Sequence, residues 1–316
     1  MPVISVSGLS KSFGGLDAVS GLSFDVEEGE IYGLLGPNGA GKTTTVRMLA
    51  CIISPSGGTA AVAGHDIRAD PVAVRRSVGV LTESPSLYER LTAEENLTFF
   101  ARAYGMTDDR KVSGRVKELL QFFQLWDRRG EKSAVFSKGM KQKLAIARAL
   151  VHDPPVIFLD EPTAGLDPEA SKLIRDLITE MSQKERHTIM LCTHRLEDAE
   201  KVCSRVMVVN MGRRVVVGSP DEIRSEVAGK AKLEVMVANP STALVEAAAS
   251  VAGVSAGAIA ENGRLIFELD DLNAATPLVV RALVESGARV LTVNTFLPSL
   301  EEAYLRLIKG DGWDSR

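Results

Sequence analysis

The stretch that decides the fold is Ile31-Tyr-Gly-Leu-Leu-Gly36-Pro-Asn-Gly-Ala-Gly41-Lys42-Thr43. It begins with an apolar run, Ile31–Leu35, which predicts a strand, and it continues through a glycine-rich turn into a helical stretch over about residues 41–50. Residues 36–43 match the pattern G-x-x-x-x-G-K-[ST] in the strand, turn and helix context that this pattern requires. A chain of this length would show such a match by chance about once in a hundred.

This glycine-rich loop predicts a site for the phosphates of a nucleotide. Small residues let backbone N–H groups wrap around phosphate oxygens, and the N-terminus of the following helix adds positive potential. Lys42 would reach the β- and γ-phosphates, and Thr43 would offer its hydroxyl to Mg²⁺. The residues expected to bind the nucleotide here are Gly36, Pro37, Asn38, Gly39, Ala40, Gly41, Lys42, Thr43 and Thr44.

Two carboxylates follow a second apolar run, Val156–Leu159. In a parallel sheet the carboxyl end of this strand faces the same way as the phosphate loop. Asp160 is then placed to hold Mg²⁺, and Glu161 to orient and deprotonate an attacking water molecule. A solvated acidic strand end before the turn at Pro162 is the structural alternative, and the phosphate loop upstream favours the catalytic interpretation.

A histidine also follows a strand, because His194 comes after the apolar run at 188–192. There its imidazole could touch the γ-phosphate, although a lone histidine in such a position is more often packed or capping a helix. Cys51, Cys192 and Cys203 form no C-x-x-C pair, which argues against a disulfide framework or a thiolate metal site and favours reducing cytosol.

The order of elements predicts two domains. Strands and helices alternate over residues 1–228, which indicates an α/β domain with a parallel sheet, interrupted by a helical insertion at about 84–153. Thr92-Ala-Glu-Glu95 is a capping box that opens the insertion's first helix. Residues 229–310 read as βαββαβ, the order of a small ferredoxin-like α+β domain, and 311–316 form a tail.

Composition limits the function classes. The 316 residues include 41 acidic and 37 basic side chains, a net charge of −4 that gives no overall attraction to nucleic acid or anionic lipid. We therefore expect no nucleic-acid partner. No run approaches the roughly 20 apolar residues of a membrane helix, so any role at a membrane would depend on a partner protein.

Together these motifs resemble those of the nucleotide-binding subunits of ABC transporters over residues 1–228, which implies the P-loop NTPase fold. Residues 36–43 are similar to the family's Walker A loop, and 156–161 to its Walker B strand with the catalytic glutamate. His194 is similar to the switch histidine, and Phe13 stands where an aromatic ring stacks on adenine. Ala164-Gly-Leu-Asp167 is similar to the D-loop, and Ser137-Lys-Gly139-Met to the signature.

The chain departs from the family pattern at two places. Glu83 stands where a glutamine usually contacts Mg²⁺ and water, so a neutral contact becomes a charged one. Three of the five signature residues are replaced, whereas Ser137 and Gly139, the family's γ-phosphate contacts, are kept. By itself the helix after Ser137 is also typical of a packed, basic amphipathic helix.

The resemblance implies an enzyme that hydrolyses ATP with Mg²⁺ and drives export through a separate integral membrane permease. The protein would work as a homodimer at the cytoplasmic face of the cell membrane, as a peripheral subunit. Each of two sites would combine one copy's Lys42, Thr43, Asp160, Glu161 and His194 with the other copy's Ser137 and Gly139. Glu83 and Asp167 would also contribute to nucleotide binding. Lys42, Glu161 and His194 would be catalytic, and Thr43, Glu83 and Asp160 would hold Mg²⁺.

Two other functions stay open at this point. One is a soluble ATPase of the same family that acts on ribosomes or DNA, although those usually carry two cassettes or a long coiled coil. The other is a regulatory nucleotide binder without hydrolysis, which Glu161 beside Asp160 disfavours. The C-terminal domain resembles the accessory domain of exporters with a separate permease. A small-ligand sensor and a dimer-stabilising module both fit it.

Overall fold

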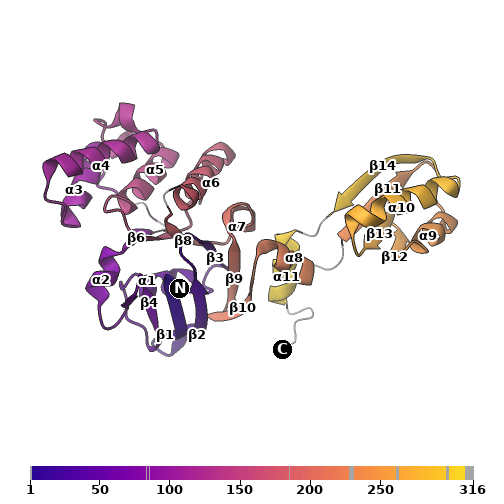
Figure 1. The fold of residues 1–316 in the computed structure, drawn as a ribbon, viewed down its shortest axis with the longest axis horizontal. Coiled ribbons are helices and arrows are strands. Elements are labelled where there is room, and N and C mark those ends of the chain that lie inside the picture. The colour runs from indigo at the N-terminus through magenta and orange to yellow at the C-terminus, as the bar shows by residue number, and fades with distance from the viewer. Residues whose placement is uncertain are drawn as a thin grey trace. The chain divides into compact units, whose positions relative to one another are not determined.

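The computed structural model describes residues 2–82, 84, 86–184, 186–227, 231–260, 263–296 and 299–309 (Figure 1). The chain divides into two compact units, residues 1–220 and 221–316. None of the described helices is long and apolar enough to cross a membrane.

The first unit is built on a six-stranded sheet with the order β10-β9-β3-β8-β7-β6. All of its pairs are parallel except that β10 runs antiparallel to β9. The central strands β3, β7 and β8 are buried along their whole length, as expected of parallel strands covered by helices. The strands are β3 (Ile31–Leu35), β6 (Val78–Leu81), β7 (Val156–Asp160), β8 (Thr188–Thr193), β9 (Arg205–Asn210) and β10 (Arg213–Gly218).

Three helices pack on this sheet and follow its strands in the chain. Helix α1 (Lys42–Leu49) contacts β7 and β8, α6 (Pro168–Gln183) contacts β8, and α7 (Leu196–Val202) contacts β3 and β8. Asp167 caps α6 through its side chain, and Pro168 occupies the first helical position. The predicted alternation of strand and helix is confirmed for this part of the chain.

A second, antiparallel sheet in the first unit differs from the prediction of a single parallel sheet. Its strands have the order β2-β1-β4-β5, and β1 pairs with both β2 and β4. The apolar core lies between this sheet, α1 and the six-stranded sheet, with Ile4, Leu34 and Met48 fully buried in it. The elements are β1 (Ile4–Phe13), β2 (Leu16–Val26), β4 (Gly57–Val62), β5 (His65–Asp66) and the short helix α2 (Pro71–Arg76).

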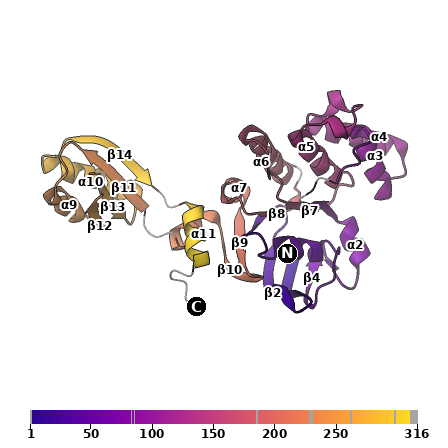
Figure 2. The same cartoon turned by 180° about the vertical axis from the view of Figure 1, so that it is seen from behind.

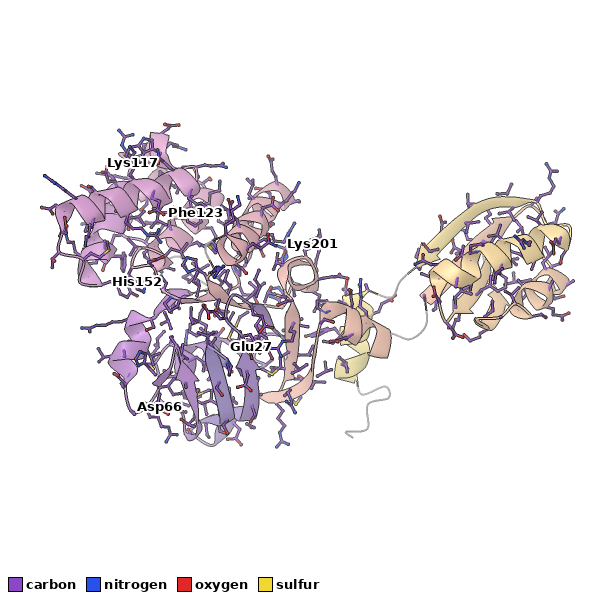
Figure 3. The ribbon with its side chains drawn as sticks, viewed as in Figure 1. Glu27, Asp66, Lys117, Phe123, His152 and Lys201 are labelled. Carbon is purple, nitrogen blue, oxygen red and sulfur yellow. The ribbon has the colours of Figure 1, made fainter. Side chains whose placement is uncertain are left out.

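The helical insertion consists of three helices and two short 3₁₀ turns. The capping box of Thr92 and Glu95 is confirmed, since each side chain accepts a hydrogen bond from the other residue's N–H. Phe123, labelled in Figure 3, is fully buried here, and α5 contacts β6 at the edge of the sheet. The elements are α3 (Ala93–Ala103), α4 (Asp109–Phe122), η1 (Trp126–Arg128), η2 (Ser133–Val135) and α5 (Lys138–Ala149).

The second unit holds a four-stranded antiparallel sheet with the order β12-β13-β11-β14 (Figure 2). Leu233, Phe267 and Val279 belong to its apolar core. The predicted tail at 311–316 lies outside the described residues. The elements are α8 (Pro220–Val227), β11 (Ala231–Val237), α9 (Thr242–Ala249), β12 (Val254–Ile259), β13 (Leu265–Leu269), α10 (Leu272–Glu285), β14 (Val290–Phe296) and α11 (Leu300–Lys309).

Candidate functional site

The glycine-rich loop joins β3 to α1, and two of its glycines have no room for a side chain. A Cβ atom on Gly36 would collide with the carbonyl oxygen of Val209. Gly41 precedes α1 with a φ of 103°, and a Cβ there would lie 2.5 Å from the carbonyl oxygen of Ala18. Only glycine fits such positions, because other residues rarely adopt a positive φ and a Cβ would displace backbone.

The side chain of Lys42 lies inside this loop and is 6% exposed. Its Nζ donates to the carbonyl oxygens of Gly36 at 2.7 Å and Pro37 at 3.2 Å. The same ammonium lies 3.9 Å from Glu161 Oε1. A buried positive charge that is held by neutral carbonyls and one carboxylate can face an anion bound in the loop.

Thr43 and Asp160 meet where α1 begins and β7 ends. The Thr43 hydroxyl donates to Asp160 Oδ2 at 2.8 Å, and Asp160 is 3% exposed. One hydroxyl and one carboxylate fit Mg²⁺, which commonly takes one or two carboxylates together with phosphate oxygens. Glu83, the third predicted ligand, lies outside the described residues. Among the described residues, no group of three or more His, Cys, Asp or Glu side chains is placed to hold a metal ion.

Glu161 is oriented by three donors from the end of β8 and the residue after it. Its Oε1 accepts from the His194 N–H at 3.0 Å and from His194 Nδ1 at 2.8 Å, while Oε2 accepts from the Thr193 hydroxyl at 3.2 Å. Its φ is 51°, a strained value for a residue with a side chain. Glu161 is 9% exposed, whereas the His194 side chain is half exposed. The carboxylate is therefore aimed from a fixed backbone.

A pocket of about 500 Å³ brings most of the predicted residues together. Phe13 is half exposed at this pocket, and the Lys11 ammonium lies 4.9 Å from its ring centroid. An exposed ring in such a place offers an apolar face to a flat ligand. The described lining consists of Phe13, Ala18, Asn38, Gly39, Ala40, Gly41, Lys42, Thr43, Thr44, Glu161, Ala164 and His194.

Six of the predicted residues that the structure describes are not part of that lining: Gly36, Pro37, Asp160, Ser137, Gly139 and Asp167. Asp160 lines a second pocket, of about 300 Å³, together with Thr43. Ser137 is exposed and caps α5, where its hydroxyl accepts from the Met140 N–H at 3.3 Å, and Gly139 lies in the first turn of the same helix. Asp167 accepts from the Ala170 N–H at 2.8 Å. The structure of one copy therefore leaves Ser137, Gly139 and Asp167 outside its own pocket.

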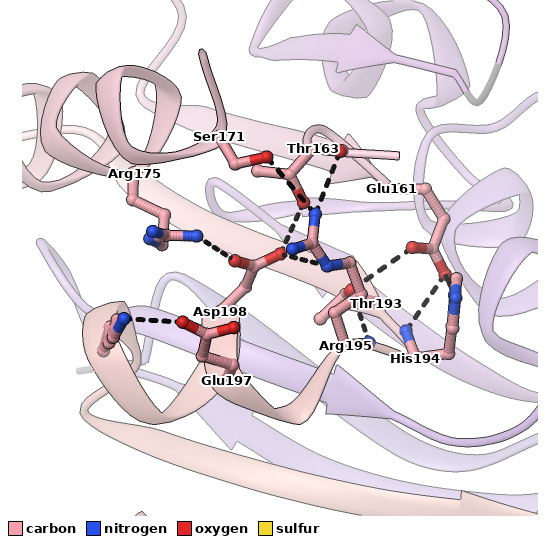
Figure 4. Close-up of polar contacts among 10 residues, drawn as sticks. Glu161, Thr163, Ser171, Arg175, Thr193, His194, Arg195, Glu197 and Asp198 are labelled. Atoms are coloured by element: carbon pink, nitrogen blue, oxygen red, sulfur yellow. Dashed lines mark hydrogen bonds and ion pairs between the residues drawn. The ribbon is translucent and has the colours of Figure 1, made fainter. Parts of the chain in front are cut away.

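Residues behind the pocket form a polar network that the sequence patterns did not indicate (Figure 4). Asp198, in the first turn of α7, is buried and contacts Thr163, Arg175 and Arg195. In the sequence, only position pointed to these two residues. Arg195 directly follows His194, and Asp198 lies three residues after Arg195. Neither residue belongs to a general pattern, so only the fold identifies them.

Cys192 is paired with Asp160 across β8 and β7, but it is no candidate nucleophile. Burial, and after it the Asp160 carboxylate, raise the pKa of its thiol well above the usual range. The thiol therefore stays neutral at physiological pH, and a neutral thiol is a poor nucleophile. Cys51, Cys192 and Cys203 are all free.

Comparison with known proteins places this site in a family context. A family model described as "ABC transporter" matches residues 19–164. Nod factor export ATP-binding protein I of Rhizobium sp. (strain N33) is 37% identical over 306 residues, 96% of each chain. The daunorubicin/doxorubicin resistance ATP-binding protein DrrA of Streptomyces peucetius is 35% identical over 308 residues, 96% of this chain and 92% of that protein.

A similar solved structure is cbiO1 from Clostridium perfringens, described as part of the ABC transporter complex cbiONQ. It is 29% identical and has a TM-score of 0.66, covering 71% of this chain and 91% of its own.

Proposed function

The chain belongs to the ATP-binding subunits of ABC transporters, and we propose that it hydrolyses Mg²⁺-ATP to drive export through a separate membrane permease. The observation that carries this proposal is the single pocket lined by the phosphate loop, Glu161 and His194. Two relatives that match nearly the whole chain are named for Nod factor export and for drug resistance. The first name states export, and expelling a drug from the cell would give the resistance that the second name states.

ATP would bind with its phosphates in the glycine-rich loop and its adenine on the ring of Phe13. Lys42, already inside the loop, would exchange its carbonyl contacts for the β- and γ-phosphates. Thr43 and Asp160, which contact each other at 2.8 Å, would hold Mg²⁺, and Glu83 would contribute from the segment after β6. When bound, Mg²⁺ neutralises charge on the phosphates as the terminal bond breaks.

Glu161 would act as the general base. Its carboxylate is nearly buried and is held by the His194 imidazole and the Thr193 hydroxyl, so its direction is set before the nucleotide arrives. His194 also lines the pocket and would contact the γ-phosphate from there.

A second copy of the chain would complete each site. Ser137 is exposed at the N-terminus of α5 and lies outside the pocket of its own copy, which suits a contact made to another copy. In the head-to-tail dimer that we propose, Ser137, Gly139 and Asp167 of one copy face the ATP bound by the other. ATP then favours the closed dimer and hydrolysis reopens it. The helical insertion, at about 84–153, would pass that motion to the permease.

We also propose that the chain is peripheral at the cytoplasmic face of the membrane, with an ATP-binding domain at 1–228 and a ferredoxin-like accessory domain at 229–310. The order β11-α9-β12-β13-α10-β14 and the antiparallel sheet order β12-β13-β11-β14 support the second assignment. The division of the chain near residue 220 supports the boundary between the domains.

Loss of the loop lysine tests the site. Lys42→Ala should weaken ATP binding and abolish phosphate release from Mg²⁺-ATP, because the mobile charge opposite the β- and γ-phosphates is gone. The matched control is Lys184→Ala, which removes an exposed lysine paired with Glu180 on the surface and should hydrolyse ATP like the parent. Equal turnover by Lys42→Ala and the parent would contradict the proposal.

Purification from native membranes tests the partner. The tagged full-length chain should bring down an integral membrane protein, and high-salt extraction without detergent should release the chain from membranes that lack this protein. A chain that purifies with ribosomes or nucleic acid instead would favour the alternative of a soluble ATPase.

A further inference from the structure

The polar network behind Glu161 is centred on one buried carboxylate. Asp198 is 1% exposed, and it accepts hydrogen bonds from the Thr163 hydroxyl and, at 2.5 Å, from Arg175 Nη1. Arg195 Nε lies 3.5 Å from Asp198 Oδ2, the oxygen that also accepts from Thr163. Figure 4 shows these side chains converging from the turn after β7, from α6 and from the start of α7.

Stability alone is a weak reason for such a cluster. Removing charges from water is costly, and a buried ion pair is often no more stabilising than apolar side chains of the same volume. The contacts of the cluster with the reacting groups are therefore the more informative feature.

Arg195 connects the network to the residues that hold Glu161. Its Nη1 donates to the carbonyl oxygen of Thr163 at 3.1 Å and to the Ser171 hydroxyl at 3.3 Å. Its backbone N–H donates to the Thr193 hydroxyl at 2.9 Å, and that hydroxyl in turn donates to Glu161 Oε2 at 3.2 Å. Two hydrogen bonds in series thus run from the Arg195 backbone N–H to the proposed base, while the guanidinium of the same residue contacts Thr163 and Asp198.

The turn after β7 and the segment that follows β8 contact each other at two points. Glu161 contacts Thr193 and His194, and two residues later Thr163 contacts Arg195 and Asp198. The strained backbone of Glu161 needs surroundings that hold it in place. Fastening the turn on both sides of Pro162 provides this restraint.

We propose that Asp198 is a positioning residue for hydrolysis, which holds the turn after Glu161 and the segment after β8 in one fixed arrangement through Thr163, Arg175 and Arg195. The inference rests on the proposed ATP hydrolysis and adds residues to its machinery. Thr163 also directly precedes the 164–167 segment, so a contact made there by a second copy is passed to Glu161 through the same network.

The test removes one hydroxyl without changing shape or charge. Thr163→Val deletes the donor to Asp198, and Thr163→Ser keeps it, so the pair isolates the hydrogen bond. For the full-length chain with Mg²⁺-ATP, Thr163→Val should lower kcat about tenfold or more while KM and the Kd for ATP stay within about twofold, since misplacing a reacting group acts on the chemical step. Thr163→Ser should retain kcat within about threefold of the parent.

A partly exposed ion pair at the opposite end of β3 from the phosphate loop supplies the control for stability. Glu30 pairs with Arg205 at 2.7 Å. Glu30 directly precedes β3, whereas the phosphate loop follows the other end of that strand. Glu30→Gln should lower Tm and leave kcat unchanged at a temperature where it is folded. Asp198→Asn, a second variant of the network, should lower kcat with unchanged ATP binding, and it replaces Thr163→Val if that variant does not fold.

The possible outcomes distinguish the proposed ATP hydrolysis from the positioning role of Asp198. If the parent hydrolyses ATP and Lys42→Ala does not, the proposed function stands whatever Thr163→Val does. A folded Thr163→Val or Asp198→Asn with parental kcat overturns the positioning role alone, as does a Glu30→Gln variant that loses kcat in the same proportion. A parent that hydrolyses nothing overturns both.

Discussion

The first unit buries charged side chains at the carboxyl ends of β7 and β8, whereas in the second unit every buried side chain that the structure describes is apolar. Lys42, Asp160, Glu161, Arg175 and Asp198 are each less than a tenth exposed. Both units have an apolar core under a sheet, so the difference is not one of fold stability.

The difference indicates where chemistry is concentrated. Burying a charge is unfavourable unless partners compensate it, and the first unit supplies those partners around one pocket. The second unit is stabilised by apolar burial among the residues described. Changing one side chain at a time in each unit tests this difference between the two units.

The largest effect is expected at Glu161. Glu161→Gln keeps the shape of the side chain and removes the proton acceptor, so hydrolysis should fall by about 10²–10⁴ while ATP still binds. Because hydrolysis no longer reopens the dimer, size-exclusion chromatography with Mg²⁺-ATP should show a larger species. Glu180→Gln, on the exposed face of α6, is the control and should resemble the parent. Normal turnover by Glu161→Gln would show that another residue is the base.

In the second unit the largest change is expected from its core, not from a charge. Phe267 is fully buried in β13, and Phe267→Ala should destabilise this unit by about 3–5 kcal/mol through the lost burial and the cavity left behind. Limited proteolysis should cut residues 231–296 faster, while ATP hydrolysis by the first unit persists. Loss of hydrolysis in step with proteolysis would contradict the separation of roles.

A smaller effect is expected from His152, which is partly buried in the first unit outside the site (Figure 3). It stacks on Tyr104, and its Nε2 lies 3.1 Å from the Val78 carbonyl oxygen. Burial lowers the pKa of His152 to about 4 from its ordinary value near 6.5. The unfolded chain thus binds the proton more tightly, and stability is lost as pH falls from about 6.5 toward 4.

Thermal unfolding between pH 7.5 and 4.5 measures this contribution. His152→Gln lacks the titrating group, so at pH 5 its loss of stability should be smaller than the parent's by up to about 2 kcal/mol. Parallel curves for the parent and His152→Gln would contradict the burial effect.

Local sequence determined the phosphate loop and its neighbours more directly than it determined the antiparallel sheet. Strand β3 has the predicted bounds, because an apolar run and a glycine-rich turn delimit it. Strand β4 was missed because Gly57-Gly-Thr-Ala-Ala-Val has glycines and alanines in place of branched residues, and its pairing with β1 holds it in the sheet.

The site residues show the same contrast between local motifs and distant contacts. Lys42, Thr43 and Glu161 could be assigned because they stand in motifs or directly follow a strand. Asp198 and Thr163 could not, since their partners come from segments that are distant in the sequence and meet only in the fold. Phe13 was assigned by resemblance alone, and its place beside the pocket agrees with that prediction.

Each active site is proposed to be shared between two copies, and two inactive variants can test this arrangement. In Glu161→Gln the base is missing, and in Ser137→Arg the bulky side chain would block the γ-phosphate region of the opposite copy. Neither homodimer has an intact site. In a mixed dimer both lesions fall in one site, and the other combines a native Glu161 with a native Ser137.

The most direct measurement is the rate of ATP hydrolysis after the two variants are mixed in equal amounts, with chemical cross-linking to show that mixed dimers have formed. Shared sites predict that hydrolysis rises above the rate of either variant alone, and that mixing each variant with more of itself restores nothing. If cross-linked mixed dimers are present and hydrolysis stays at the level of the separate variants, the shared site assigned to Glu161 and Ser137 is contradicted.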